Sequence, residues 1–186
     1  AASTSPLTHI APQEPQPEIG LKLFNEINAS MAKLTGIAPT LPAISDRYQR
    51  IEQQLPTGID AESFVSSQQM AITQLAIGYC SALVDSPSQR SVTIPNINFD
   101  SGPSTSLNTV GRKTLIDSLY KSFVGPVEPD SMSSALPATT TRTELGNLLT
   151  KLIDDCPTCA DTPARTQTLV KATCTAVLAS AQTLLQ

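Results

Sequence analysis

The fold is decided by the stretch DAESFVSSQQMAITQLAIGYCSALVD, residues 60–85, which predicts the longest helix in the chain. Apolar residues recur along it every three or four positions, as in a helix that buries a broad apolar stripe. Asp60 is a suitable N-cap, Glu62 adds negative charge to the first turn, and Ser86-Pro87 ends the helix. We expect this helix of roughly 24 residues, about 36 Å long, to be the centre of an all-α domain.

Five further segments show helical spacing of apolar residues, and two long irregular loops interrupt them. The predicted helices cover residues 18–35, 43–55, 109–124 and 141–155 and a last segment from residue 163 onward, and the loops cover residues 86–106 and 127–140. Thr141 and Glu144 form a capping box that predicts where the fifth helix begins. The sequence therefore predicts a single-domain helical bundle of about six helices in residues 18–186, preceded by a Pro-rich arm in residues 1–17.

The composition of the chain limits its functions. The net charge is −4, and the 12 Lys and Arg residues form no cluster in the sequence, which disfavours nucleic acid and anionic membranes as partners. No run approaches about 18 consecutive apolar residues, so no transmembrane segment is predicted. Charged residues make up 15%, and the surplus of uncharged polar residues suits an extracytoplasmic protein. The opening Ala-Ala-Ser-Thr-Ser-Pro fits a mature protein after signal cleavage, or a fragment of a longer chain.

Four cysteines predict two disulfides in an oxidising compartment, Cys80–Cys174 and Cys156–Cys159, one of three possible connectivities. The alternative for Cys80 and Cys174 is two buried free thiols. Cys156 and Cys159 form a CPTC turn, which we interpret as structural, with a redox dithiol as the alternative that a βαβ setting would favour. Attachment of c-type haem is excluded because Ala160 replaces the required histidine. A four-cysteine zinc site is disfavoured because Cys174 lies about four helical turns beyond Cys159.

The chain resembles a helical region of large secreted proteins of marine gammaproteobacteria that are commonly labelled LamG-domain-containing. The strings that carry the resemblance are FNEINASMAKLTGI, QQLPTGIDAESFVSSQQMAITQLAIGYCSALVD and VKATCTAVLASAQTLLQ, within residues 19–85 and 165–186. The resemblance implies a cell-envelope or secreted setting, often beside a lectin-like jelly roll and a c-type haem segment. Neither companion is visible in this sequence, and the family offers no catalytic residues to transfer.

Candidate interaction residues fall in the Pro-rich arm and in the first long loop. They are His9, Pro12 and Pro15 in the arm, and Ile94, Ile97 and Phe99 in the loop. Both segments suit wrapping a partner and ordering on contact, and we expect the loop to lie across the bundle as a lid. His9 is the only histidine, and we interpret it as a solvated linker residue, with ligation of a partner's haem or of a metal as the alternative.

The sequence thus predicts a non-enzymatic, periplasmic or extracellular helical module that acts as a structural or protein-interaction subunit of an assembly. Its partner is expected to be another protein, such as a haem protein, or an identical subunit. We predict no catalytic residue, no resident cofactor and no metal site. The first alternative is a carrier of a small apolar ligand or cofactor, with a cavity lined by Phe24, Phe64, Met70 and Phe123. The second is a thiol–disulfide oxidoreductase that uses the CPTC cysteines.

Overall fold

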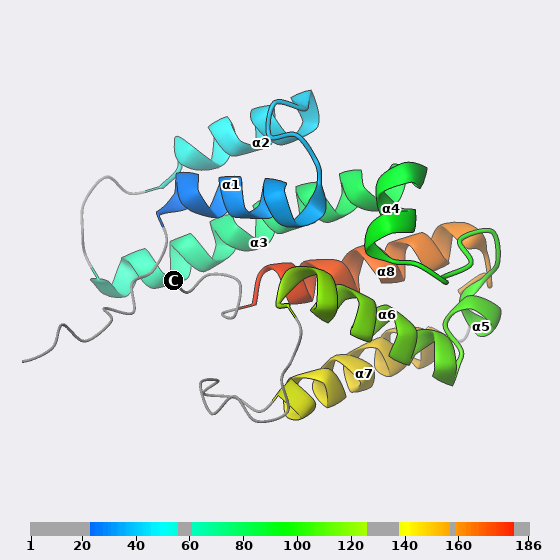
Figure 1. Ribbon diagram of the computed structural model, residues 1–186. Coiled ribbons are helices and arrows are strands. Elements are labelled where there is room, and N and C mark those ends of the chain that lie inside the picture. The colour runs from blue at the N-terminus through cyan, green and yellow to red at the C-terminus, as the bar shows by residue number, and fades with distance from the viewer. Residues whose placement is uncertain (1–22, 56–60, 126–137, 157–158, 181–186) are drawn as a thin grey trace, which may run out of the picture.

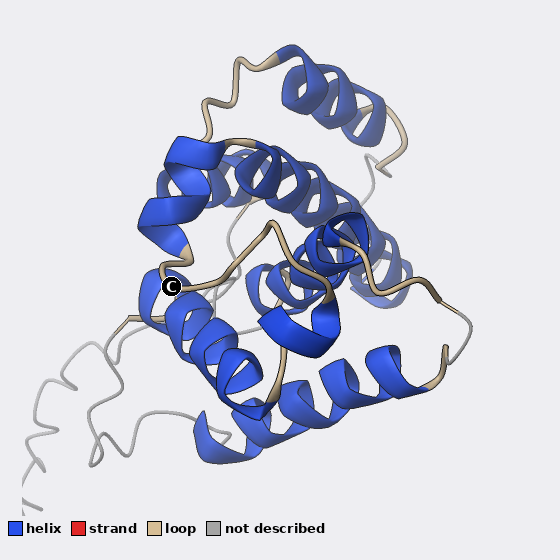
Figure 2. Ribbon diagram, turned by 90° about the vertical axis from the view of Figure 1, so that its right-hand side faces the viewer, coloured by secondary structure: helices blue, strands red, loops and turns tan. Residues whose placement is uncertain are grey.

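The computed structural model describes residues 23–55, 61–125, 138–156 and 159–180, and every regular element in these ranges is a helix (Figure 1, Figure 2). The helices are α1 (Phe24–Thr35), α2 (Pro42–Glu52), α3 (Ala61–Asp85), α4 (Pro87–Thr93), α5 (Pro103–Ser106), α6 (Thr109–Phe123), α7 (Ala138–Asp154) and α8 (Pro163–Leu178). The predicted all-α fold is confirmed. The described ranges hold eight helices rather than about six, because α4 and α5 form inside a segment that was expected to be irregular.

Helix α3 is the longest element and lies at the centre, as the periodicity of its sequence predicts. It contacts α1, α2, α4 and α8, and Figure 1 shows it running across the middle of the molecule with α1 and α2 on one side and α8 on the other. Its fully buried side chains are Leu75, Ala76, Tyr79, Cys80, Leu83 and Val84. The helix is thus enclosed on several sides in its C-terminal half, which explains why so many consecutive positions there are apolar.

Helix α8 connects the central helix α3 with α6 and α7. It packs along α3 and also contacts α5, α6 and α7, so that α6 and α7 reach the central helix mainly through it. Cys174 of α8 is bonded to Cys80 of α3, and both residues are fully buried. Near the end of α3, Lys171 Nζ lies 2.7 Å from Asp85 Oδ1. A covalent bond and an ion pair therefore fix α8 against α3.

The segment 86–106 is a packed, partly helical strap rather than an irregular lid. Pro87 and Pro103 each occupy the first turn of a short helix. Proline fits there because the N–H that it lacks would have no partner within the helix. Within the strap, Ser106 Oγ at the end of α5 donates to the carbonyl of Asn98, and Thr166 Oγ1 of α8 donates to the carbonyl of Ser101 at 2.7 Å. The first bond links two parts of the strap, and the second joins the strap to α8.

Local capping residues fix the ends of α1 and α6, and the start of α7 differs from the prediction. Gly36 ends α1 with φ 68°, a left-handed conformation that glycine adopts without steric cost. Helix α7 begins at Ala138, three residues before Thr141, so the predicted capping box does not mark its start. Asn108 caps α6 by accepting hydrogen bonds from the N–H groups of Val110 and Gly111. The arm at residues 1–17 and most of the second predicted loop lie outside the described residues.

Candidate functional site

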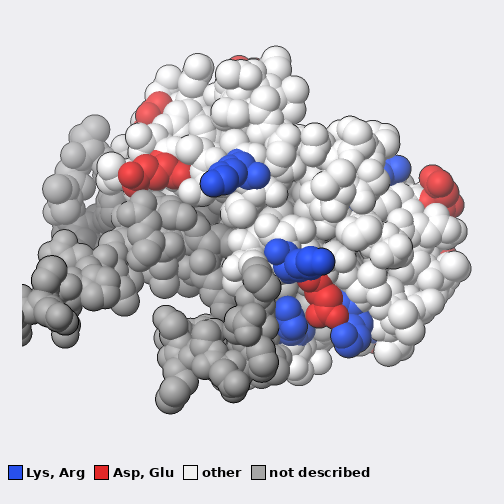
Figure 3. Space-filling model, viewed as in Figure 1, with Lys and Arg blue, Asp and Glu red and all other residues white. Residues whose placement is uncertain are grey.

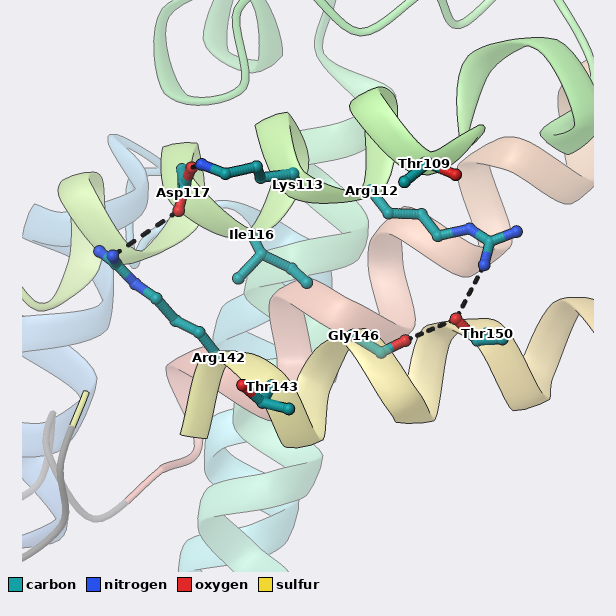
Figure 4. A pocket seen from close by; sticks show the side chains of 9 residues that line it. All are labelled: Thr109, Arg112, Lys113, Ile116, Asp117, Arg142, Thr143, Gly146 and Thr150. Atoms are coloured by element: carbon teal, nitrogen blue, oxygen red, sulfur yellow. Dashed lines mark hydrogen bonds and ion pairs between the residues drawn. The ribbon is translucent and has the colours of Figure 1, made fainter. Parts of the chain in front are cut away.

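An open groove of about 450 Å³ runs between α6 and α7 (Figure 4). The described residues that line it are Thr109, Arg112, Lys113, Ile116 and Asp117 of α6, with Arg142, Thr143, Gly146 and Thr150 of α7. Both walls are helices of more than a dozen residues, and both pack on α8, so the groove is built on rigid elements. Three of its lining side chains are cationic and one is anionic, which gives the lining a net charge of two positive units.

At one end of the groove, Asp117 lies between two cations. Lys113 Nζ is 2.6 Å from Asp117 Oδ2, whereas Arg142 Nη1 is 3.7 Å from Asp117 Oδ1. The Arg142 guanidinium also lies over the ring of Tyr120, with its carbon 5.0 Å from the ring centre. Its Nε is buried and has no hydrogen-bond partner, a state that typically costs about 1–3 kcal/mol. Lys113 is therefore the main partner of Asp117, and the hydrogen-bonding capacity of Arg142 is only partly used.

At the other end, a chain of hydrogen bonds fixes the side chain of Arg112. Its Nε donates to the carbonyl of Leu107 at 2.8 Å, and its Nη1 donates to Thr150 Oγ1 at 2.8 Å. The Thr150 hydroxyl in turn donates to the carbonyl of Gly146, also at 2.8 Å. Arg112 is thus held in one position before any ligand arrives, which lowers the entropy that binding would cost.

The floor between the two ends is apolar and carries a helical glycine. Ile116 and Gly146 lie there, between the outward-pointing guanidinium groups of Arg112 and Arg142 (Figure 4). A Cβ on Gly146 would meet only Ile116 Cδ1, at 3.9 Å, which is an ordinary contact. Glycine inside a helix costs roughly 0.5–1 kcal/mol relative to alanine. Since packing does not require glycine at this position, its clearest effect is to keep the floor of the groove open.

The groove is also where charge gathers on one face of the molecule. Most of the described surface in Figure 3 is uncharged, and blue and red side chains alternate in a cluster over α6 and α7. The ion pairs of Asp117 with Lys113 and Arg142 belong to this region. A local cationic groove on a chain of net charge −4 favours anions with a few well-placed negative groups.

The four cysteines form the two disulfides that the sequence predicts. The Cα atoms of Cys80 and Cys174 are 5.8 Å apart, and those of Cys156 and Cys159 are 5.2 Å apart, within the usual range for disulfides. The second pair is half-buried in the turn between α7 and α8. In the described part of the chain, no group of three or more His, Cys, Asp or Glu side chains could hold a metal ion.

The loop residues predicted to bind a partner are instead part of the core. Ile94, Ile97 and Phe99 are 1%, 9% and 6% exposed, so they anchor the strap rather than present an apolar surface. Arg90 lies over the ring of Phe99, 4.5 Å from its centre, and donates to the carbonyl of Val84 at 3.2 Å. The apolar side chains of this segment are thus buried within the chain itself. His9, Pro12 and Pro15 lie outside the described residues.

Of the four residues proposed for a carrier cavity, the three whose side chains are described lie in different surroundings. Phe123 belongs to the core, Met70 is 63% exposed, and Phe24 stacks on Tyr48 with ring centres 5.1 Å apart. The side chain of Phe64 lies outside the described part of the structure. The groove between α6 and α7 was not predicted. The sequence features that belong to the groove are Gly146, within an apolar helical pattern, and Arg112 and Arg142, each near the start of its helix.

Searches of protein-family models, curated proteins and solved structures found no match to this chain. The resemblance to LamG-domain-containing proteins therefore stays a prediction. No helix in the described ranges is both long enough and apolar enough to cross a membrane.

Proposed function

We propose that this protein is a non-enzymatic, exported helical module that acts by binding, as a structural or protein-interaction subunit of a cell-envelope or extracellular assembly. The observation that carries the proposal is the Cys80–Cys174 pair, which lies inside the core at the contact between α3 and α8. Disulfides at such positions persist in oxidising compartments and are rare in the reducing cytosol. The resemblance of the chain to helical regions of secreted proteins supports the same compartment.

Exposed apolar side chains support binding to another protein. Met70 and Ile77, seven residues apart on α3, are 63% and 42% exposed. Leu148 and Leu152, one turn apart on α7, are 42% and 36% exposed. Residues at these spacings share one face of a helix, so each pair places two apolar side chains where a partner protein would cover them. The partner in this proposal is another protein or a second copy of the chain.

Native mass spectrometry of protein isolated from its source tests the proposal. We expect the chain in the envelope or secreted fraction, with its four cysteines blocked to alkylation until they are reduced, and in a complex with a partner or a second copy. Replacing Leu148 and Leu152 together with lysine should weaken that complex. Replacing the isolated Val92, which is 77% exposed, is the matched control and should not weaken it. A cytosolic chain with four free thiols, or one that is always alone, would contradict the proposal.

A further inference from the structure

We propose that the groove between α6 and α7 is a binding site for a small dicarboxylate, an organic molecule with a carboxylate at each end of a short apolar spacer. This inference does not depend on the proposed function, because the ligand is a free small molecule and not a partner protein. It rests on the positions of the two arginines, which Figure 4 shows at opposite ends of the groove, with Ile116 and Gly146 between them.

Charge selects a ligand with one negative group for each end. At the first end, Arg142 and Lys113 share one carboxylate, Asp117, which leaves one positive charge without a counterion among the described lining residues. At the second end, Arg112 bonds only uncharged oxygens, the carbonyl of Leu107 and the hydroxyl of Thr150. A dianion would neutralise both ends at once, whereas a monoanion would leave one end uncompensated.

The hydrogen-bonding capacity of the two arginines suits a carboxylate at each end. A guanidinium has five N–H donors in a planar fork that matches a carboxylate. The bonds of Arg112 to Leu107 and Thr150 use two of these donors, so three others are available for a ligand oxygen. Arg142 has a long ion pair to Asp117, at 3.7 Å, which is beyond hydrogen-bond distance. A carboxylate in the groove would give the Arg142 side chain a better partner than Asp117 offers at 3.7 Å.

The middle of the groove selects an apolar spacer of limited bulk. Ile116 supplies an apolar surface there, and Gly146 supplies space that any side chain would reduce. The volume of about 450 Å³ lies within the range of sites for small organic ligands. A methylene chain lying over Ile116 and Gly146 would join the two carboxylate positions without placing a polar group on the apolar floor.

The test is isothermal titration of the disulfide-intact full chain with a series of diacids, namely succinate, glutarate, adipate and suberate, at low ionic strength. We expect saturable binding with an optimum at one spacer length. The best diacid should bind roughly tenfold or more tightly than hexanoate, which has one carboxylate only, because its second charged contact contributes to affinity. No saturable binding of any diacid up to roughly 10 mM, or equal affinity for hexanoate, would overturn the proposal.

Three variants separate the two ends and the floor. Arg112→Gln and Arg142→Gln should each weaken the best diacid roughly tenfold and remove the preference for one spacer length. Gly146→Leu keeps every charge and should abolish binding by filling the floor, which tests the site independently of the arginines. Arg50→Gln on α2 is the matched control and should bind as the unaltered chain does.

Circular dichroism confirms that each variant is folded before it is titrated. Equal loss of affinity in Arg50→Gln would show that general charge, not the groove, attracts the ligand, and would overturn the proposal. So would full affinity in Gly146→Leu, or binding of acidic peptides with no binding of free diacids. None of these results bears on whether the protein is exported or part of an assembly.

Discussion

Removal of the Cys80–Cys174 disulfide should destabilise the fold far more than removal of the Cys156–Cys159 disulfide. The bridge joins residues 94 apart in the sequence, whereas Cys156–Cys159 joins residues only three apart. In the chain-entropy model, a bridge stabilises the fold by restricting the unfolded chain, and its effect grows with the logarithm of loop length. For a loop of this length the model gives about 4.7 kcal/mol, and for the CPTC turn less than about 2 kcal/mol.

We therefore expect the Cys80→Ala, Cys174→Ala variant to lose roughly 3–5 kcal/mol of unfolding free energy. For a domain of this size that corresponds to a fall of roughly 10–15 °C in melting temperature. Both cysteines are fully buried, so the missing sulfur atoms also leave a small cavity, which adds to the loss. The Cys156→Ala, Cys159→Ala variant should lose clearly less, because its bridge closes a short loop in a half-buried turn.

Urea unfolding followed by circular dichroism measures both losses. A further measurement on fully reduced, unaltered protein separates the effect of the cross-link from the effect of the cavity. This protein lacks the cross-links and keeps all four sulfur atoms. If the Cys80–Cys174 variant is no less stable than the Cys156–Cys159 variant, the long bridge does not restrict the unfolded chain as argued. If reduction alone has no effect and the alanine variant is unstable, the loss comes from packing and the entropic reasoning is wrong.

Three further substitutions test individual contacts. Gly102→Ala should destabilise the fold by about 1–3 kcal/mol in urea unfolding, because the added Cβ would overlap both the carboxyl group and the backbone of Asp161. The Ser104 hydroxyl, and then its N–H, donate to Asp161 and hold the pKa of that carboxyl below its ordinary value of 3.8. The contribution of this carboxylate is fully present above pH 3.8 and is lost as pH falls through the lower folded pKa. The difference in melting temperature between Asp161→Asn and the unaltered chain should therefore be present at pH 7 and shrink as the pH is lowered below 3.8. Tyr79→Phe removes the 2.6 Å hydrogen bond from the Tyr79 hydroxyl to Asn28 Oδ1 and should lower the unfolding free energy by about 1 kcal/mol. No loss would show that the bond only offsets the cost of removing the two groups from water.

The main helices could be predicted because each has a local signal that tertiary packing then reinforces. The predicted helix at residues 60–85 matches α3 to within one residue. The apolar spacing marks the body of the helix, and Ser86-Pro87 marks its end. The strap at 86–106 differs from the prediction because its short helices are stabilised by distant parts of the chain, α4 by α3 and α6 and α5 by α8, which no local pattern reveals. Its apolar residues were recognised, but the sequence does not say whether they are buried by the chain or by a partner.

The groove could not be predicted because it depends on how two helices pair. Arg112 and Arg142 are 30 positions apart in the sequence, and each alone is typical of a solvated helix face. Only the packing of α6 against α7 brings both to one groove and shows that Gly146 lies between them. Gly146 is a glycine inside a helix, and without its neighbours it predicts only a weaker helix.

The charge of the groove is unusual against the rest of this chain. Lysine and arginine make up 12 of 186 residues, yet they supply three of the nine described lining residues of the groove. In a protein with so few charges, like charges held close together cost electrostatic energy unless something else compensates them. Asp117 compensates one of the three, and the hydrogen bonds of Arg112 orient its charge without neutralising it. The groove therefore keeps a positive potential in a position fixed by α8 and, through the Cys80–Cys174 bridge, by the central helix. A surface that needed only solubility could spread these charges apart, so their arrangement around an open, glycine-floored groove is best explained by an anionic ligand.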